Sequence, residues 1–259
     1  RHKIVPTPLS VEQVYGSFLE PWAHHHMTGQ AANKSFFMVA SILFAALVFL
    51  AFAQKFYLGW LVKSPPLSLL LQVHGTVMTG WVALFVVQVT LIEMRKTRIH
   101  QRLGKIGAGW AVLVIVLGTV TTLHASAREV RGHTEMAPFQ LTITGLELTE
   151  MLLFAGFVVS AVWLRHRGDY HKRLMLLTLM CMLPSVLPRL PLGLFQSLLS
   201  ILLAVYAALA LCIGIDFLQQ RKLHPAFAVG GSIFASTLLL AFLGAQTAAW
   251  HSFLRDIVS

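Results

Sequence analysis

The sequence predicts an all-α fold, a polytopic integral membrane bundle of seven transmembrane helices with a cytoplasmic amino terminus. Of the 259 residues, 56% are hydrophobic and 12% are charged, and the mean hydropathy is +0.72. A soluble domain carries about 25% charged residues, so this chain lacks the polar surface that a water-soluble protein needs. Apolar segments of membrane-spanning length and an uneven distribution of Lys and Arg are the other two observations behind the prediction.

The apolar segments divide the chain into a polar amino-terminal segment, residues 1–34, and a transmembrane domain, residues 35–259. A hydrocarbon core of about 30 Å takes about 20 apolar helical residues to cross. Backbone polar groups in lipid must be satisfied internally, which favours helices. We expect spans at 35–53, 67–92, 105–124, 141–164, 173–191, 194–217 and 226–250.

The Lys and Arg residues set the expected orientation. The loops after the second, fourth and sixth spans, together with the amino-terminal segment, carry 14 of the 20 Lys and Arg residues. The positive-inside rule places this side in the cytoplasm. We therefore assign the net charge of +10 to topology rather than to nucleic-acid binding.

Prolines in the fifth span and the two cysteines of the chain carry further information about the fold. Pro184, Pro188 and Pro191 fall in the outer half of the fifth span, where they predict a bend that either serves packing or shapes a pocket. The only two cysteines, Cys181 and Cys212, lie in apolar runs and read as buried thiols, which excludes a disulfide scaffold.

Five ionisable residues are expected in the outer half of the membrane, where each is a candidate for function because burying a charge in lipid is costly. They are His74, His124, Glu147, Glu150 and Arg189. One interpretation is a metal site formed by His74, His124, Glu147 and Glu150, with His74 beside the open space at Gly75. The alternatives are a structural ion pair of Arg189 with Glu147 or Glu150, and a proton pathway.

A second group of polar residues is expected at the cytoplasmic face. The blocks His100-Gln101-Arg102-Leu103-Gly104 and His171-Lys172-Arg173-Leu174-Met175 each place a histidine and basic residues at the start of a span. His100 and His171 could be axial ligands of a haem. The alternatives are a basic cradle for haem propionates, a quinone head or lipid phosphate, and a turn that anchors the chain to lipid.

The order of these motifs resembles a family of uncharacterised bacterial multi-pass membrane proteins that share a domain of unknown function. The resemblance covers residues 67–192 and implies His74, His100 and His171 as signature positions, without implying an activity. The architecture more weakly resembles di-haem b-type cytochromes and ferric-reductase-like membrane proteins. That likeness implies His100 and His171 as the inner haem ligands and leaves only His124 as a partner for His74 on the outer side.

These observations lead to one main functional hypothesis and two alternatives. The main hypothesis is electron transfer through haem b or another histidine-ligated metal centre, in a bacterial inner membrane, with the bilayer, a quinone and other membrane subunits as partners. The alternatives are a non-catalytic accessory or assembly subunit of a membrane complex, and a small-molecule or ion transporter. No nucleophile elbow, phosphate-binding glycine loop or Cys-x-x-Cys pair is present, so whether the chain is an enzyme is left open.

Overall fold

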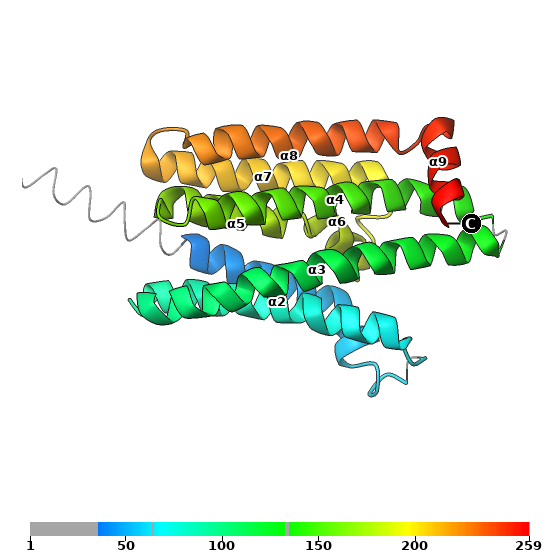
Figure 1. Cartoon of the computed structure of the whole chain (residues 1–259), viewed down its shortest axis with the longest axis horizontal. Coiled ribbons are helices and arrows are strands. Elements are labelled where there is room, and N and C mark those ends of the chain that lie inside the picture. The colour runs from blue at the N-terminus through cyan, green and yellow to red at the C-terminus, as the bar shows by residue number, and fades with distance from the viewer. Residues whose placement is uncertain (1–35, 64, 133–134, 259) are drawn as a thin grey trace, which may run out of the picture.

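The computed structural model describes residues 36–63, 65–132 and 135–258, which contain helices and no strand. The expected polar segment 1–34 lies outside the described residues. Within them, six helices are long and apolar enough to cross a membrane, which is the architecture of a multi-pass helical membrane protein (Figure 1). They are Phe36–Tyr57, α2 (Leu69–Glu93), α3 (Thr97–Arg131), α4 (Ala137–Trp163), α7 (Leu198–Gln220) and α8 (Pro225–Gly244).

The segment expected to form the fifth span is broken rather than continuous. It consists of α5 (Gly168–Met180), the short α6 (Leu183–Val186) and the 3-10 turn η2 (Leu187–Arg189). Proline removes a backbone donor and clashes with the preceding turn, and Pro184 and Pro188 stand in the first turns of α6 and η2. At 1.5 Å per residue, α5 alone is about 20 Å long, too short to cross about 30 Å of hydrocarbon.

Both ends of α3 and the end of the last span also differ from the sequence prediction. Helix α3 has 35 residues and extends past both ends of the expected span 105–124, to a length of about 52 Å. The expected last span, 226–250, ends instead at Gly244. A turn follows, and α9 (Ala248–Val258) lies across one end of the bundle (Figure 1). Helix α9 is amphipathic and buries Leu254 and Val258, while the hydroxyl of Thr142 in α4 pairs with His251 at 2.9 Å.

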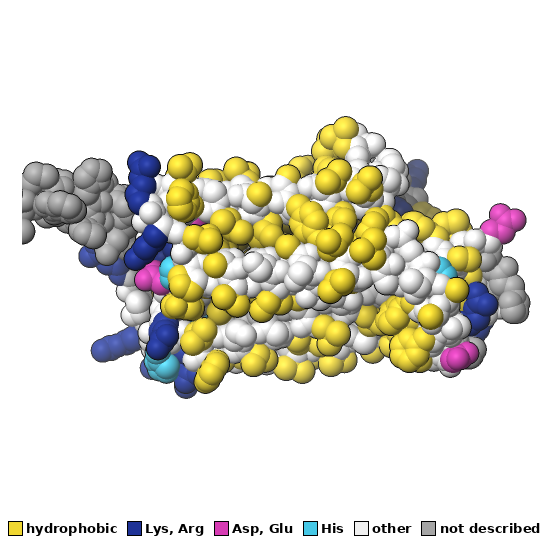
Figure 2. Space-filling model, turned by 90° about the horizontal axis from the view of Figure 1, so that it is seen from above, with side chains coloured by type: hydrophobic (Ala, Val, Ile, Leu, Met, Phe, Trp, Pro, Cys, Tyr) yellow, Lys and Arg dark blue, Asp and Glu magenta, His cyan; other side chains and the backbone are white. Residues whose placement is uncertain are grey.

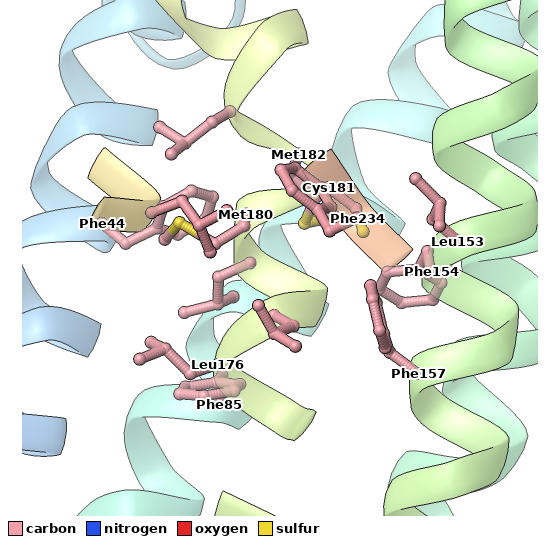
Figure 3. Close-up of a cluster of buried hydrophobic side chains, with 14 of the residues drawn as sticks. Phe44, Phe85, Leu153, Phe154, Phe157, Leu176, Met180, Cys181, Met182 and Phe234 are labelled. Atoms are coloured by element: carbon pink, nitrogen blue, oxygen red, sulfur yellow. The ribbon is translucent and has the colours of Figure 1, made fainter. Parts of the chain in front are cut away.

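Helix α4 lies at the centre of the bundle and packs against α3, α5, α8 and α9. Figure 3 shows Phe154 and Phe157 of α4 in a cluster with Phe234 of α8 and with Met180 and Cys181 at the end of α5. These aromatic and sulfur side chains fill the space where the broken fifth segment turns. The cysteines are free thiols, Cys181 buried in this core and Cys212 half-buried.

Close approach between α2 and α3 depends on glycine. A Cβ atom at Gly80 would lie 2.4 Å from Cζ2 of Trp110, whose indole nitrogen donates to the Val77 carbonyl at 2.9 Å. Only glycine at position 80 allows the Trp110 indole to approach α2 this closely. By contrast, a Cβ atom at Gly156 in α4 would meet nothing within 4 Å.

Candidate functional site

The two histidines that begin the cytoplasmic blocks lie together at one end of the bundle. His100 is in the first turn of α3 and His171 is in the first turn of α5. Their ring centroids are 6.2 Å apart and the ring planes meet at 88°. The structure thus brings together the two residues expected to form an inner pair, from helices α3 and α5 that both pack on α4.

The hydrogen bonds of this pair leave ring nitrogens available. Nδ1 of His171 lies 2.8 Å from the Ala161 carbonyl, which can only accept, so Nδ1 carries the proton and Nε2 of the neutral ring has the free lone pair. Nδ1 of His100 is buried without a hydrogen-bond partner in the described part of the chain. Oε1 of Gln88, in α2, is likewise buried without a hydrogen-bond partner in that part of the chain. Buried polar atoms are rarely left unpaired, so this cluster is prepared for a ligand.

The arrangement fits two imidazoles on one metal centre. Metal–nitrogen bonds of about 2.1 Å and ring radii of about 1.2 Å place the centroids about 4.5–6.5 Å apart, depending on the angle at the metal. The observed 6.2 Å falls within this range. A ligand imidazole whose other nitrogen donates to a backbone carbonyl is also the usual arrangement in metalloproteins, and His171 has it.

A bare metal ion fits less well than a group that brings ligands of its own. Across residues 36–63, 65–132 and 135–258, no set of three or more His, Cys, Asp or Glu residues is positioned to hold a metal ion. A structural or catalytic zinc site takes three or four protein ligands. Haem iron needs only axial ligands from the protein because the macrocycle supplies the rest.

Arg173 corrects one expectation about this end of the molecule. The sequence placed it in a surface block that could cradle an anion, but its side chain is 1% exposed and forms an ion pair with Asp216 of α7. Nε donates to Oδ2 at 2.9 Å and Nη2 donates to Oδ1 at 2.6 Å. Nη1 donates to the Asp169 carbonyl at 2.8 Å. Arg173 therefore joins α5 to α7 and is not free to bind an external anion.

His224 lies beside this ion pair, just before α8. Its Nδ1 accepts a hydrogen bond from the Ala226 amide at 3.2 Å, so the neutral imidazole caps the amino terminus of α8. Its ring packs edge-on against Tyr170, with centroids 4.8 Å apart. Burial lowers the pKa of His224, and the positive charge of Arg173 lowers it further, against the opposite effects of Asp216 and Asp169. A protonated ring would lose the cap.

The four residues expected to form an outer metal site do not form one. His124 is exposed on α3, and His74 of α2 is half-buried with its Nδ1 atom unpaired. The space expected at Gly75 is filled, because a Cβ atom there would lie 2.5 Å from the ring of Phe56. Glu147 and Glu150 line one cavity, but within the described residues no three of these side chains come together to hold a metal ion.

The expected ion pair of Arg189 with Glu147 or Glu150 is also not formed as a direct contact. Among the described residues, no nitrogen of Arg189 lies within 4.0 Å of either carboxylate; the guanidinium donates to the Ser185 carbonyl and lies 5.4 Å from the centre of the Phe52 ring. Thr122 donates to Oε2 of Glu147 at 2.8 Å. All three charged residues nevertheless line one cavity of about 390 Å³.

Sequence reasoning missed Asp216, Thr122 and Ser185. Asp216 could have been found, since it is the one acidic residue in the 23 apolar-rich residues of α7, and a charge inside a span needs a partner. The two hydroxyl residues gave no comparable signal, because Ser and Thr in membrane helices commonly bond their own backbone.

The chain matches no protein-family model, no curated protein and no solved structure. The function must therefore be argued from the site itself.

Proposed function

We propose that this chain is a membrane electron-transfer protein that binds haem b between His100 and His171. The observation that carries the proposal is the pair of imidazoles 6.2 Å apart, one fixed by the Ala161 carbonyl and the other with a buried, unpaired nitrogen. Haem supplies the redox chemistry when bound. His100 of α3 and His171 of α5 would hold the iron from two helices.

Basic side chains near the pair are suited to the haem propionates. Arg98, Arg102 and Lys105 are exposed on the first turns of α3, near His100. Figure 2 shows Lys and Arg side chains gathered at one end of the molecule, with histidine among them. Guanidinium groups bind carboxylates through paired hydrogen bonds. These residues take the role that Arg173 cannot, because Arg173 is already paired with Asp216.

We further propose seven crossings with the basic end in the cytoplasm, in a bacterial inner membrane. In Figure 1 the segment from α5 to η2 runs along the bundle between the end of α4 and the start of α7, which supports a broken fifth crossing. Reporter fusions after residues 97, 168 and 222 should be active in the cytoplasm. A cytoplasmic reporter after residue 131 would contradict this topology.

The electron donor and acceptor follow from the location of the haem. Residues 36–63, 65–132 and 135–258 form helices and short connections, so electrons would pass through the bilayer region or across the basic end. A lipid-soluble quinone and a partner membrane subunit are the two classes of partner suited to those routes.

The decisive experiment is the absorption spectrum of the protein purified from a haem-producing host. We expect a Soret band and about one haem per chain by pyridine haemochrome. His100→Gln and His171→Gln should each lose most of the haem, because an amide is a poor ligand for iron. His166→Gln is the matched control, since His166 is exposed near the same end, after α4.

The outer histidine provides a second control. His74→Gln should keep its haem, because the pair of histidine rings proposed as ligands is formed by His100 and His171. Equal haem in all the variants, or haem in none of them including the wild type, would refute the proposal and favour the accessory-subunit hypothesis. Loss of haem in His74→Gln alone would move the site to the outer half.

A further inference from the structure

We propose that the cavity around Glu147 and Glu150 binds a small organic amine, a ligand with a protonated nitrogen and an apolar body. The cavity has a volume of about 390 Å³ and lies between α4, α6, η2, α7 and α8. It lies toward the opposite end of the bundle from His100 and His171, because α4 begins where α3 ends. The inference is therefore independent of the haem proposal.

Most of the cavity lining is apolar, and the uncharged polar residues Gln140, Ser185, Gln196 and Ser197 line it together with Glu147, Glu150 and Arg189. Ligand sites of about 300–1,000 Å³ typically combine apolar walls with a few polar groups that orient the ligand. The rim carries exposed side chains at the start of α4 and α7, Phe139 and Ser197 among them, so a molecule can enter. The apolar lining includes Ile143, Leu202, Val205, Leu238 and Phe242.

Glu150 is the polar group that most requires a partner. It is 2% exposed and lines the cavity, yet its printed contact is one long hydrogen bond of 3.4 Å from the Ser185 hydroxyl to Oε2. Within the described part of the chain, no donor bonds Oε1 and no cationic nitrogen lies within 4.0 Å of the carboxylate. A buried carboxylate without a counter-charge is costly, and a cation in the cavity would remove that cost.

The nearby cation of the protein is close enough to attract Glu150 but forms no direct ion pair with it among the described residues. Arg189 lines the same cavity, but its guanidinium is bound to the Ser185 carbonyl and packed on Phe52. Glu147 accepts a hydrogen bond from Thr122 through one oxygen and lines the cavity beside Glu150. Two carboxylates and one engaged guanidinium leave this side of the cavity favourable to one positive charge.

An organic amine suits the cavity better than a metal ion does. Calcium takes six to eight oxygen ligands and magnesium keeps several waters, whereas most of this lining offers carbon. An ammonium group can donate to both carboxylates while its apolar body replaces water along Leu202, Val205 and Phe242.

The test compares phenethylamine with phenethyl alcohol, which has nearly the same shape and no charge at neutral pH. Binding of each is measured by equilibrium dialysis against the full chain in lipid nanodiscs, with empty nanodiscs subtracted. We expect saturable binding of the amine and at least tenfold weaker binding of the alcohol. Glu150→Gln should weaken amine binding at least tenfold and leave alcohol binding unchanged.

Two further variants keep the test decisive. Glu135→Gln, at an exposed position before α4, should bind the amine as the wild type does. Ile143→Trp should block the cavity and abolish binding of both probes. If size-exclusion chromatography shows that Glu150→Gln is not folded, Ile143→Trp and Glu147→Gln test the proposal in its place. Equal affinities for the two probes, no saturable amine binding, or amine binding that survives Glu150→Gln or Ile143→Trp would overturn the proposal.

Discussion

Removing one partner of the Arg173–Asp216 ion pair should be the most destabilising single change in this bundle. Both side chains are 1% exposed, and two hydrogen bonds of 2.6 and 2.9 Å join the guanidinium to the carboxylate. Breaking a buried pair by removing one partner costs about 3–5 kcal/mol, because the remaining buried charge loses its direct partner. We therefore expect Arg173→Met and Asp216→Leu each to lower the free energy of unfolding by about that amount.

The double variant separates the pair from its surroundings. Apolar residues of similar size often replace a buried ion pair at little cost, so Arg173→Met/Asp216→Leu should be more stable than either single variant. The Nη1 bond of Arg173 to the Asp169 carbonyl is lost in the double variant as well, which removes about 1–3 kcal/mol of charge-assisted hydrogen bonding. The coupling energy between the two sites should still reach about 2–3 kcal/mol.

Equilibrium unfolding in mixed micelles of dodecyl maltoside and SDS, followed by tryptophan fluorescence, measures these free energies. Arg128→Met is the control, because Arg128 is 71% exposed and its ion pair with the neighbouring Glu129 is on the surface. Its effect should stay below about 0.5–1 kcal/mol. A loss under about 1 kcal/mol for Arg173→Met, or strictly additive effects in the double variant, would refute the argument.

Three further predictions use the same purified protein. Gly80→Ala should lower the free energy of unfolding by about 1–3 kcal/mol because its methyl group meets the Trp110 ring, whereas Gly156→Ala should raise it; equal effects would contradict the packing. His224 has a lowered pKa, so the stability that its neutral ring provides is present above about pH 6.5 and is lost as the pH falls below that value. His224→Asn keeps a capping side chain and should flatten thermal stability between about pH 7 and pH 5; an unchanged pH dependence would exclude His224 as the cause. Leu254→Ser should speed amide hydrogen exchange in α9 and leave α3 and α4 unchanged, and protection that stays the same in α9 would show that Leu254 does not anchor it.

Composition and hydropathy predicted the helical class because a chain in lipid must satisfy its own backbone, which leaves few alternatives. Helix ends were less predictable. Helix α3 extends through polar and charged residues to Thr97 and Arg131. Hydropathy does not predict a helix in these end segments, although their backbone is helical. The run that was expected to reach residue 250 stops at Gly244, and α9 packs on α3 and α4 instead of continuing α8.

The rotation of each helix explains why one expected pair of histidines meets and the other does not. Depth along the membrane follows from residue spacing alone, and it placed His74 and His124 at similar depths. Residue spacing does not give the direction of a side chain, and His124 of α3 is exposed at the surface while His74 of α2 is half-buried. His100 and His171 lie in the first turns of helices that both pack on α4, and the Ala161 carbonyl of α4 holds the His171 ring.

Equal depth predicts an ion pair only where both helices are continuous. Arg173 lies five residues into α5 and Asp216 lies four residues before the end of α7. Since the start of α5 and the end of α7 are at the same end of the bundle, both charges lie about 6–8 Å from that end, and they form an ion pair.

Arg189 was expected at the same depth as Glu147 and Glu150, but Pro184 and Pro188 interrupt the helix before Arg189. Proline frees backbone carbonyls from their helical partners, and Arg189 donates to the Ser185 carbonyl, four residues earlier, in place of a carboxylate. The break that satisfies Arg189 locally is thus also what leaves Glu150 without a direct ion pair beside the cavity.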